Sequence, residues 1–420
     1  MLTRIGLLAL CSCVFAAELP LIKAVQDRDQ KAVLARLRAG ADVNQTRDDK
    51  STALIWAANR EDSEITAALL AAGAKPNLAD ENGETALLIA AGNGNVAMVR
   101  MLIAAGADVN ALRWDGSTPL FGAVSAGNIE LTKLLMDHGA KVGAAERRMG
   151  QTPLMWAALG GHADIVKALI ENGADVNAPS KSGFTALLFA AQRGETGIAR
   201  VLLDAKADPK AKSAEGNTAF TIALERGNED VARLMLEYGA DVNARDHNGS
   251  TPLHEAVRQN KIELLKDLVR RGADINARIQ RSADLDFPRM NPNGLTPFLV
   301  AAQSGNIAIM KELIALGADT KIIAPDGTGP VLLAASSRKI EAVRMLVELG
   351  FDVNQAPKDT PGPLHAAVRS GVNEIVQYLA DHGADLNYKD NFGRTPLEEA
   401  EFEAPAPTIE LMRKIVAAHK

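Results

Sequence analysis

The sequence has few aromatic residues, few cysteines and no long apolar run beyond its first residues. Aromatic residues make up 4% of the 420 positions while hydrophobic residues make up 47%, so the core is not gathered around large rings. The only two cysteines are Cys11 and Cys13, which excludes a disulfide framework for the rest of the chain. No segment beyond the N-terminus is apolar enough to span a bilayer. The net charge of −6 is modest for this length, so there is no strong electrostatic case for a nucleic-acid partner.

One sequence pattern recurs along almost the whole chain. Its clearest copy is DHNGSTPLHEAV at 246–257, which ends in GADIN at 272–276. The threonine of this copy is Thr251, and threonine recurs at the matching position in Thr52, Thr85, Thr118, Thr152, Thr185, Thr218, Thr296 and Thr395. With Gly329 and Gly362 at the same position between Thr296 and Thr395, the steps are 33 residues, apart from one of 34 before Thr152 and one of 45 before Thr296. Such a period predicts a stacked array of helical units.

Each copy predicts a pair of helices. Thr251 is a good N-cap, and Pro252 stands where the first helical turn can spare an N–H group. Apolar residues at helical spacing predict a second helix near 262–269, which Gly272 ends. Pairs of small residues such as Ala57-Ala58 let neighbouring helices approach closely. Because one helix pair cannot bury its apolar face alone, each unit is expected to pack on the next.

These motifs resemble the ankyrin repeat. The resemblance rests on STPLHEAV (250–257), QTPLMWAA (151–158), ETALLIAA (84–91) and the recurring GADVN, and it extends from about Leu19 to the C-terminus. It implies an all-α solenoid of stacked helix-turn-helix units with β-turn or hairpin connections. It also implies a non-enzymatic scaffold that binds a protein partner through the concave face and the turn tips. An inhibitor or effector that docks on one specific enzyme is the alternative that the sequence leaves open.

The spacing predicts twelve repeat positions in one continuous solenoid over 17–420, which we expect to be a monomer. Gly329 and Gly362 occupy the threonine position in two copies, and Leu19 occupies it in a degenerate first copy. We expect a polar N-terminal cap at 18–43, repeats at about 44–386 and a C-terminal cap at 387–420, with a last helix near 408–418.

The N-terminus has the pattern of a secretory signal. Arg4 precedes an apolar stretch that ends in Ala16-Ala17, which predicts a signal peptide at 1–16 and a secreted or periplasmic protein. A cap helix that begins with apolar residues is one alternative. A lipid-tethered periplasmic scaffold, acylated at Cys13 within a poor lipobox, is another.

The sequence shows no strong catalytic, cofactor or metal-binding motif. His254 and His365 occupy the TPLH position, where we expect them to hydrogen-bond to the turns. Aspartates such as Asp108 and Asp175 recur in every GAD turn, which indicates architecture and not a catalytic pair. The prediction is therefore a protein without catalytic residues, cofactor or metal.

Apolar residues at the turn tips are the first candidate partner contacts. Trp114 and Phe184 are the preferred ones, and Met149 and Phe392 stand in similar turns. The alternative is that each ring packs on the adjacent turn.

Arginines near the ends of the first helices are the second group of candidates. Arg193, Arg226 and Arg258 come from consecutive repeats and are expected to form a short cationic stripe, which Glu225 partly cancels. An ordinary solvated surface is the alternative.

The step of 45 residues holds an insertion near 279–290, and insertions in repeat arrays often lie on the binding face. Phe287, Arg289 and Met290 are its candidate contacts. A tolerated surface loop is the alternative, since added loop length costs little.

Overall fold

A computed structural model describes residues 20–280, 294–358 and 360–419, and all regular elements in these ranges are helices. This confirms the predicted all-α class. The chain divides into two compact units. The first extends to residue 190 and includes 200–207, and the second comprises 191–199 and the residues from 208 onward. Helices α11 (Ala186–Arg193) and α12 (Thr196–Asp204) contain residues of both units.

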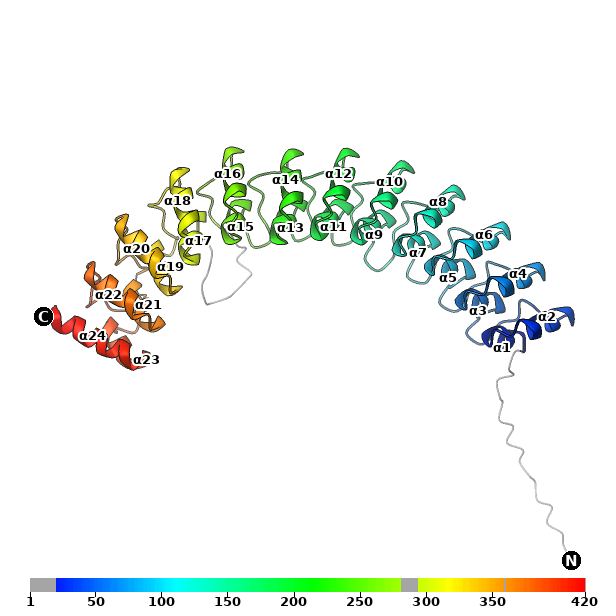
Figure 1. The fold of residues 1–420 in the computed structure, drawn as a ribbon, viewed down its shortest axis with the longest axis horizontal. Coiled ribbons are helices and arrows are strands. Elements are labelled where there is room, and N and C mark those ends of the chain that lie inside the picture. The colour runs from blue at the N-terminus through cyan, green and yellow to red at the C-terminus, as the bar shows by residue number, and fades with distance from the viewer. Residues whose placement is uncertain (1–19, 281–293, 359, 420) are drawn as a thin grey trace, which may run out of the picture. The chain divides into compact units, whose positions relative to one another are not determined.

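The first unit is built from helix pairs that follow one another along the chain (Figure 1). The first helices of its pairs are α1 (Pro20–Gln26), α3 (Ala53–Asn59), α5 (Ala86–Gly92), α7 (Pro119–Ser125) and α9 (Pro153–Gly160). The second helices are α2 (Gln30–Arg38), α4 (Ser63–Ala71), α6 (Val96–Ala104), α8 (Ile129–Asp137) and α10 (Ala163–Glu171). First helices pack on first helices and second helices on second helices, which makes two layers.

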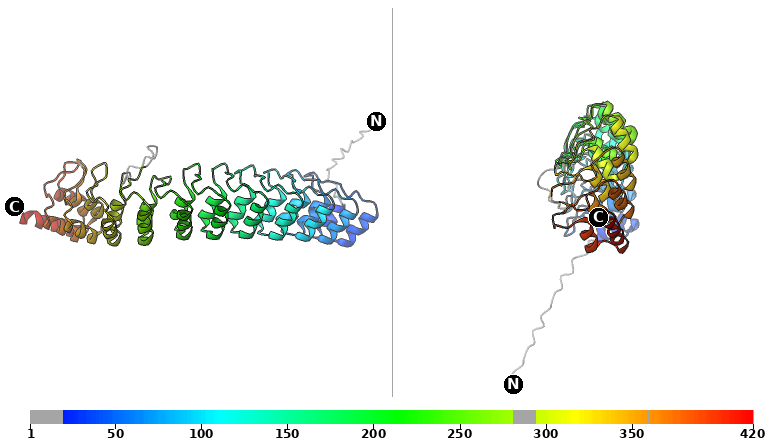
Figure 2. Two further views of the ribbon diagram at one scale, coloured as in Figure 1. Left: turned by 90° about the horizontal axis from the view of Figure 1, so that it is seen from above. Right: turned by 90° about the vertical axis from the view of Figure 1, so that its left-hand side faces the viewer.

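The second unit repeats this arrangement. Its first helices are α13 (Ala219–Glu225), α15 (Pro252–Arg258), α17 (Pro297–Ser304), α19 (Pro330–Ser336), α21 (Pro363–Ser370) and α23 (Pro396–Glu403). Its second helices are α14 (Glu229–Glu237), α16 (Ile262–Arg270), α18 (Ile307–Ala315), α20 (Ile340–Glu348), α22 (Asn373–Asp381) and α24 (Ala406–Ala418). The helix expected near 408–418 is α24. In each unit the long turns between pairs project to one side of the helices (Figure 2). We call the surface formed by these turns and the exposed ends of the first helices the inner face.

Local sequence signals set where the first helices begin. The side-chain oxygen of Thr52 accepts a hydrogen bond from the N–H of Ile55 at 3.2 Å, and Thr296 caps α17 in the same way at 3.4 Å. An N-cap of this kind satisfies a backbone donor that the helix leaves unpaired. The predicted role of the recurring threonines is confirmed at these positions, whereas Thr118 makes no such bond.

Small apolar residues let the helices approach one another, as expected from the alanine pairs. Ala57, Ala58, Ala301 and Ala302 are fully buried. Leu, Ile, Val and Ala supply most of the core in both units, together with the buried rings of Phe220 and Phe298. The core is therefore spread along each unit and not centred on one cluster.

In most repeats the asparagine at the end of GADVN ties the repeat to the next one. Asn110 Nδ2 donates to the carbonyl oxygen of Gly139 at 3.0 Å, and its Oδ1 accepts from the N–H of Lys141 at 2.9 Å. The same pair of bonds occurs at Asn44, Asn77, Asn243 and Asn354. The asparagine is replaced at the equivalent positions Gly143, Lys210 and Lys321.

Introducing the missing asparagine is expected to stabilise the first unit. A Cβ atom added at Gly143 would meet open space, so the Gly143→Asn variant can form the inter-repeat bonds. We expect the free energy of unfolding to rise by about 1 kcal/mol, since each net hydrogen bond contributes about 0.5–1.5 kcal/mol. The measurement is a urea titration followed by circular dichroism. The Gly143→Ala variant is the control for the lower backbone entropy of the unfolded chain. Equal stabilisation by both variants would show that the amide bridge contributes nothing.

Candidate functional site

The turns of the first unit expose large apolar side chains. Trp114 is 61% exposed, and Leu112 and Met149 are 54% and 45% exposed. Trp114 and Met149 lie in consecutive turns, as predicted from the sequence. Exposed aromatic and methionine side chains are typical of surfaces that bind proteins.

Backbone hydrogen bonds join these turns to one another. The N–H of Trp114 donates to the carbonyl oxygen of Asn82 at 2.9 Å, and the N–H of Arg147 donates to that of Asp115 at 2.6 Å. The N–H of Lys181 continues the series by donating to the carbonyl oxygen of Met149 at 2.8 Å. Because each turn is held by its neighbours, the exposed side chains stand on an ordered backbone.

An ion pair further anchors the turn that carries Trp114. Arg113 Nε lies 2.9 Å from Glu84 Oε1, which comes from the preceding repeat. Burial raises the pKa of the Glu84 carboxyl, although the charge of Arg113 opposes this shift. The glutamate is partly buried and the arginine is exposed, and their contact holds the base of the turn beside the preceding repeat.

Phe184, the second aromatic residue predicted to contact a partner, is half-buried. Its ring lies 5.2 Å from the ring of Phe189 in α11, centroid to centroid. Part of its surface therefore packs on the first helix of its own repeat.

The three arginines stand at the ends of first helices, as their spacing predicted, and all are exposed. Arg258 pairs with Glu255 at 3.2 Å and donates to Ser250 Oγ at 2.9 Å, so its charge is largely committed. Among the described residues, Arg193 and Arg226 form no ion pair. Of the predicted cationic stripe, Arg193 and Arg226 are therefore the arginines whose charge is not paired with a carboxylate. The other predicted contacts, Phe287, Arg289 and Met290, lie outside the described residues.

The histidines of the TPLH motif have structural hydrogen bonds, as expected. His254 Nδ1 accepts from the N–H of Thr251 at 3.2 Å, and Nε2 lies 3.0 Å from the carbonyl oxygen of Leu295. These two bonds require a neutral ring that carries its proton on Nε2. Burial of the ring lowers the pKa of His254 to about 4, although the bond to Leu295 opposes the shift. His365 makes the same bond to the carbonyl oxygen of Arg394 at 3.0 Å, and burial also lowers its pKa.

A buried ionic cluster near the C-terminus was not predicted from the sequence. Glu399 on α23 is fully buried and pairs with Arg369 and, at 3.0 Å, with Arg394. The carboxylate of Asp390 lies 3.4 Å from a guanidinium nitrogen of each of the same two arginines. Although burial alone would raise it, the N–H groups of Arg394 and Phe392 that donate to Asp390 hold the pKa of this carboxyl below its usual range. The one available signal was a glutamate four residues after the cap, where most repeats have an apolar residue.

Exposed rings cover one arginine of this cluster. The guanidinium of Arg394 lies 4.6 Å from the ring centre of Phe392 and 4.7 Å from that of Phe402. Phe392, which the sequence offered as a possible turn-tip contact, is 69% exposed and also serves this cation–π contact.

The described residues contain no group of three or more His, Cys, Asp or Glu side chains that could hold a metal ion. In the same ranges, every helix is too short or too polar to cross a membrane.

Comparison with known proteins agrees with this architecture. A family profile described as ankyrin repeats (3 copies) matches residues 21–113, 62–146, 120–213, 187–279, 281–357 and 355–412. No curated protein matches the chain. Since the matched segments cover most of the sequence, and since capped helix pairs joined by projecting turns fill both units, the chain belongs to the ankyrin-repeat family.

Proposed function

We propose that this protein is a non-enzymatic scaffold that binds a protein partner through its inner face, with the turn tips of the first unit as a principal contact. Ankyrin repeats are generally protein-interaction modules, which supports the class of function. The observation that carries the proposal is the exposed ring of Trp114 on a turn that is hydrogen-bonded to its neighbour. An ordered backbone lowers the entropy cost of presenting such a ring to a partner.

The first test is affinity capture with residues 17–420 from an extract of the source organism. The control bait carries Trp114→Ala, Phe184→Ala and Arg226→Glu and is checked for equal helicity. A partner that is retained by the wild-type bait and lost by the control supports the proposal. Equal retention by both baits contradicts the assignment of the surface.

Trp114 alone is expected to carry a large share of the affinity. We expect Trp114→Ala to weaken binding of the captured partner by about tenfold or more, because aromatic anchors dominate interface energies. The free energy of unfolding should change by only about 0.5 kcal/mol, because the side chain is mostly exposed. Titration calorimetry and a urea titration measure the two quantities. A binding loss that is matched by unfolding would contradict a direct contact.

An inhibitor or effector that docks on one enzyme remains the second candidate. It predicts a single stoichiometric partner whose activity changes on binding, whereas a scaffold predicts binding without such a change. Stoichiometry of the captured complex and an activity assay of the partner separate the two.

We also propose that the protein is exported, on the strength of the apolar stretch before Ala16-Ala17. Mass spectrometry of the N-terminus of the protein from its source is expected to find cleavage close to these residues. Metabolic labelling with a fatty acid that is lost in Cys13→Ser would instead support the lipid-tethered form.

A further inference from the structure

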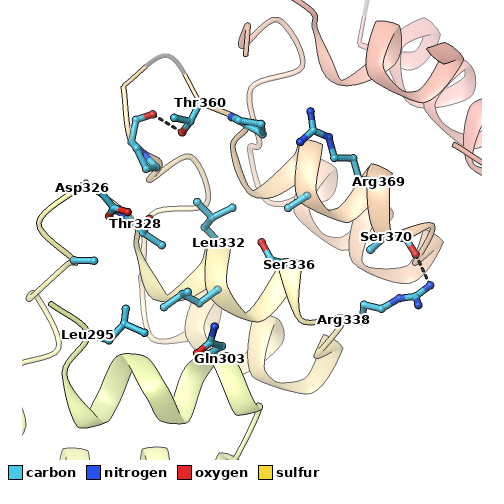
Figure 3. Close-up of a pocket in the computed structure, with 15 residues that line it drawn as sticks. Leu295, Gln303, Asp326, Thr328, Leu332, Ser336, Arg338, Thr360, Arg369 and Ser370 are labelled. Atoms are coloured by element: carbon cyan, nitrogen blue, oxygen red, sulfur yellow. Dashed lines mark hydrogen bonds between the residues drawn. The ribbon is translucent and has the colours of Figure 1, made fainter. Parts of the chain in front are cut away.

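A second candidate binding region lies on the inner face of the second unit. A groove of about 600 Å³ opens between α17, α19 and α21 and the turns that precede α19 and α21 (Figure 3). Its apolar lining, which we call the floor, includes Leu295, Leu332, Leu333 and Pro361. Four residues with hydroxyl groups, Thr328, Ser336, Thr360 and Ser370, also line the groove.

The two turns that border the groove have an apolar residue at a position that is polar or charged in the other described turns. The first of them keeps a different anchor, since Asp326 accepts the N–H of Thr328 at 2.9 Å. Five residues before the cap, Asp80 and Asp246 each accept two backbone N–H groups of their own turn at 2.8 Å. The residues at this position in the groove turns are Ala324 and Pro357, which have no side-chain acceptor. A polar side chain is therefore replaced by apolar surface in two consecutive repeats, and both apolar residues line the groove.

The same two repeats also lack the capping threonine. Gly329 and Gly362 cap α19 and α21 without a side-chain hydrogen bond. A Cβ at Gly329 would lie 2.7 Å from Cγ of Gln355, so a threonine would displace this side chain. Gln355 itself donates to the carbonyl oxygen of Gly327 at 3.2 Å. Glycine thus lets the second turn pack closely against the first. Both changes fall where the groove lies, so this part of the repeat array differs in chemistry from the rest.

Opposite charges stand at the two ends of the groove. Asp326 lies at the end formed by the turns, and Arg338 lies at the other end, with Leu332 and Ser336 between them (Figure 3). Among the described residues neither forms an ion pair. Arg369 also lines the groove, but it is held by the carboxylates of Glu399 and Asp390. Asp326 accepts the N–H of Thr328 and Arg338 donates to the carbonyl oxygen of Ser370. The groove thus has one anion and one cation that no opposite charge neutralises, with apolar residues between them.

We infer that this groove binds an extended segment of a partner protein, in which a large apolar side chain lies between a basic residue facing Asp326 and an acidic residue facing Arg338. The inference deepens the proposed function and rests on it. Thr360 and Ser370 donate their hydroxyl protons to the carbonyl oxygens of Pro357 and Ala367, so their oxygens are left as acceptors. A chain segment matches the groove because such oxygens can accept backbone N–H groups, while the apolar floor takes a side chain. The charges at the two ends set the direction in which the segment lies.

The test uses random linear peptides displayed on phage and selected on the full chain. Peptides recovered on the wild-type protein are expected to carry the basic–apolar–acidic order. Synthetic copies should bind the Ser336→Trp variant about tenfold or more weakly, because the indole would fill the groove from a half-buried position on α19. Fluorescence anisotropy of the labelled peptides measures the affinity.

A charge reversal gives a second readout that does not depend on filling the groove. Arg338 has a φ of 63°, and Glu61 occupies the equivalent position of another repeat with a φ of 56°, so this conformation accepts glutamate in the same chain. Selection on Arg338→Glu is expected to replace the acidic residue of the peptides with a basic one. The matched control is Arg28→Glu. Arg28 donates to the carbonyl oxygen of Arg60 as Arg338 does to that of Ser370, but it lies in the first unit.

Three outcomes would overturn the inference. The first is recovery of peptides without the charge order, or of peptides that bind Ser336→Trp as well as wild type. The second is recovery only of peptides whose binding is lost in Trp114→Ala, which would leave the proposed function standing. The third is an apolar dye, anilinonaphthalene sulfonate, that binds the wild type but not Ser336→Trp while no peptide is selected. That result would assign the groove to a compact apolar ligand.

Discussion

Replacing Glu399 with alanine is expected to lower the free energy of unfolding of the C-terminal repeats by about 3 kcal/mol, at the lower end of the range for breaking a buried ion pair. The carboxylate is fully buried and faces two guanidinium groups, those of Arg369 and Arg394. Removing it leaves both cations with Asp390 as their main shared partner, at 3.4 Å. Both arginines are partly exposed, so water compensates for some of the loss. Hydrogen exchange of the amides in α23 and α24, followed by mass spectrometry, measures the local opening.

Glu401 on the same helix provides the matched control. It pairs with Arg413 at 2.8 Å, and both side chains are largely exposed. The Glu401→Ala variant should therefore cost no more than about 1 kcal/mol. The Glu399→Gln variant keeps the shape and removes the charge, which separates packing from electrostatics. If the amides of α23 and α24 exchange at the same rates in Glu399→Ala and in Glu401→Ala, the ionic cluster does not stabilise the end of the repeat array.

Acidification is expected to destabilise the second unit through His254. The pKa of this histidine is about 4 in the folded chain and 6.5 in the unfolded chain, so between these values the unfolded chain binds the proton first. The stability that depends on the neutral ring is complete above pH 6.5 and is lost as the pH falls toward 4. The full loss is about 3 kcal/mol, since one pKa unit corresponds to about 1.4 kcal/mol. His365 acts in the same direction, because burial also lowers its pKa.

Urea titrations at pH 7 and pH 5 would measure this effect for the wild type and for His254→Gln. We expect the wild type to lose about 2 kcal/mol more than the variant between the two pH values, because glutamine cannot take up the proton. The His138→Gln variant, at an exposed position, controls for the loss of one histidine. An identical pH dependence in wild type and His254→Gln would contradict the role of the buried ring.

Most of the fold could be predicted because its signals are local. Thr52 and Thr296 cap the helices that follow them, and Gly272 comes two residues after α16 ends. Each signal acts within a few residues, so one copy of the pattern is enough to place a helix pair. The period then requires only that each pair packs on the next. That the two units form one continuous, monomeric solenoid stays a prediction.

The candidate sites were harder to predict because they depend on contacts between repeats. Trp114 could be recognised as a turn-tip residue, but its hydrogen-bonded support from Asn82 lies in the preceding repeat. Glu399 looks like one more acidic residue of α23 until the structure brings Arg369, thirty residues away in sequence, against it. The groove of the second unit depends on side chains that are missing at Ala324 and Gly329. In the sequence, these positions appear only as departures from the repeat pattern, and nothing in the pattern shows that they lie together.

The bridging asparagines also determine how the repeats respond to mechanical load. When a chain of this kind is pulled from its ends, the joins between neighbouring repeats carry the same force in series. Each join that contains Asn110 or Asn243 has two hydrogen bonds from the asparagine that must break before the two repeats separate. Those at Gly143, Lys210 and Lys321 have no asparagine at the bridging position, so we expect them to yield first. Under tension the protein would then extend in blocks of several repeats, whose lengths are set by where the asparagine is missing.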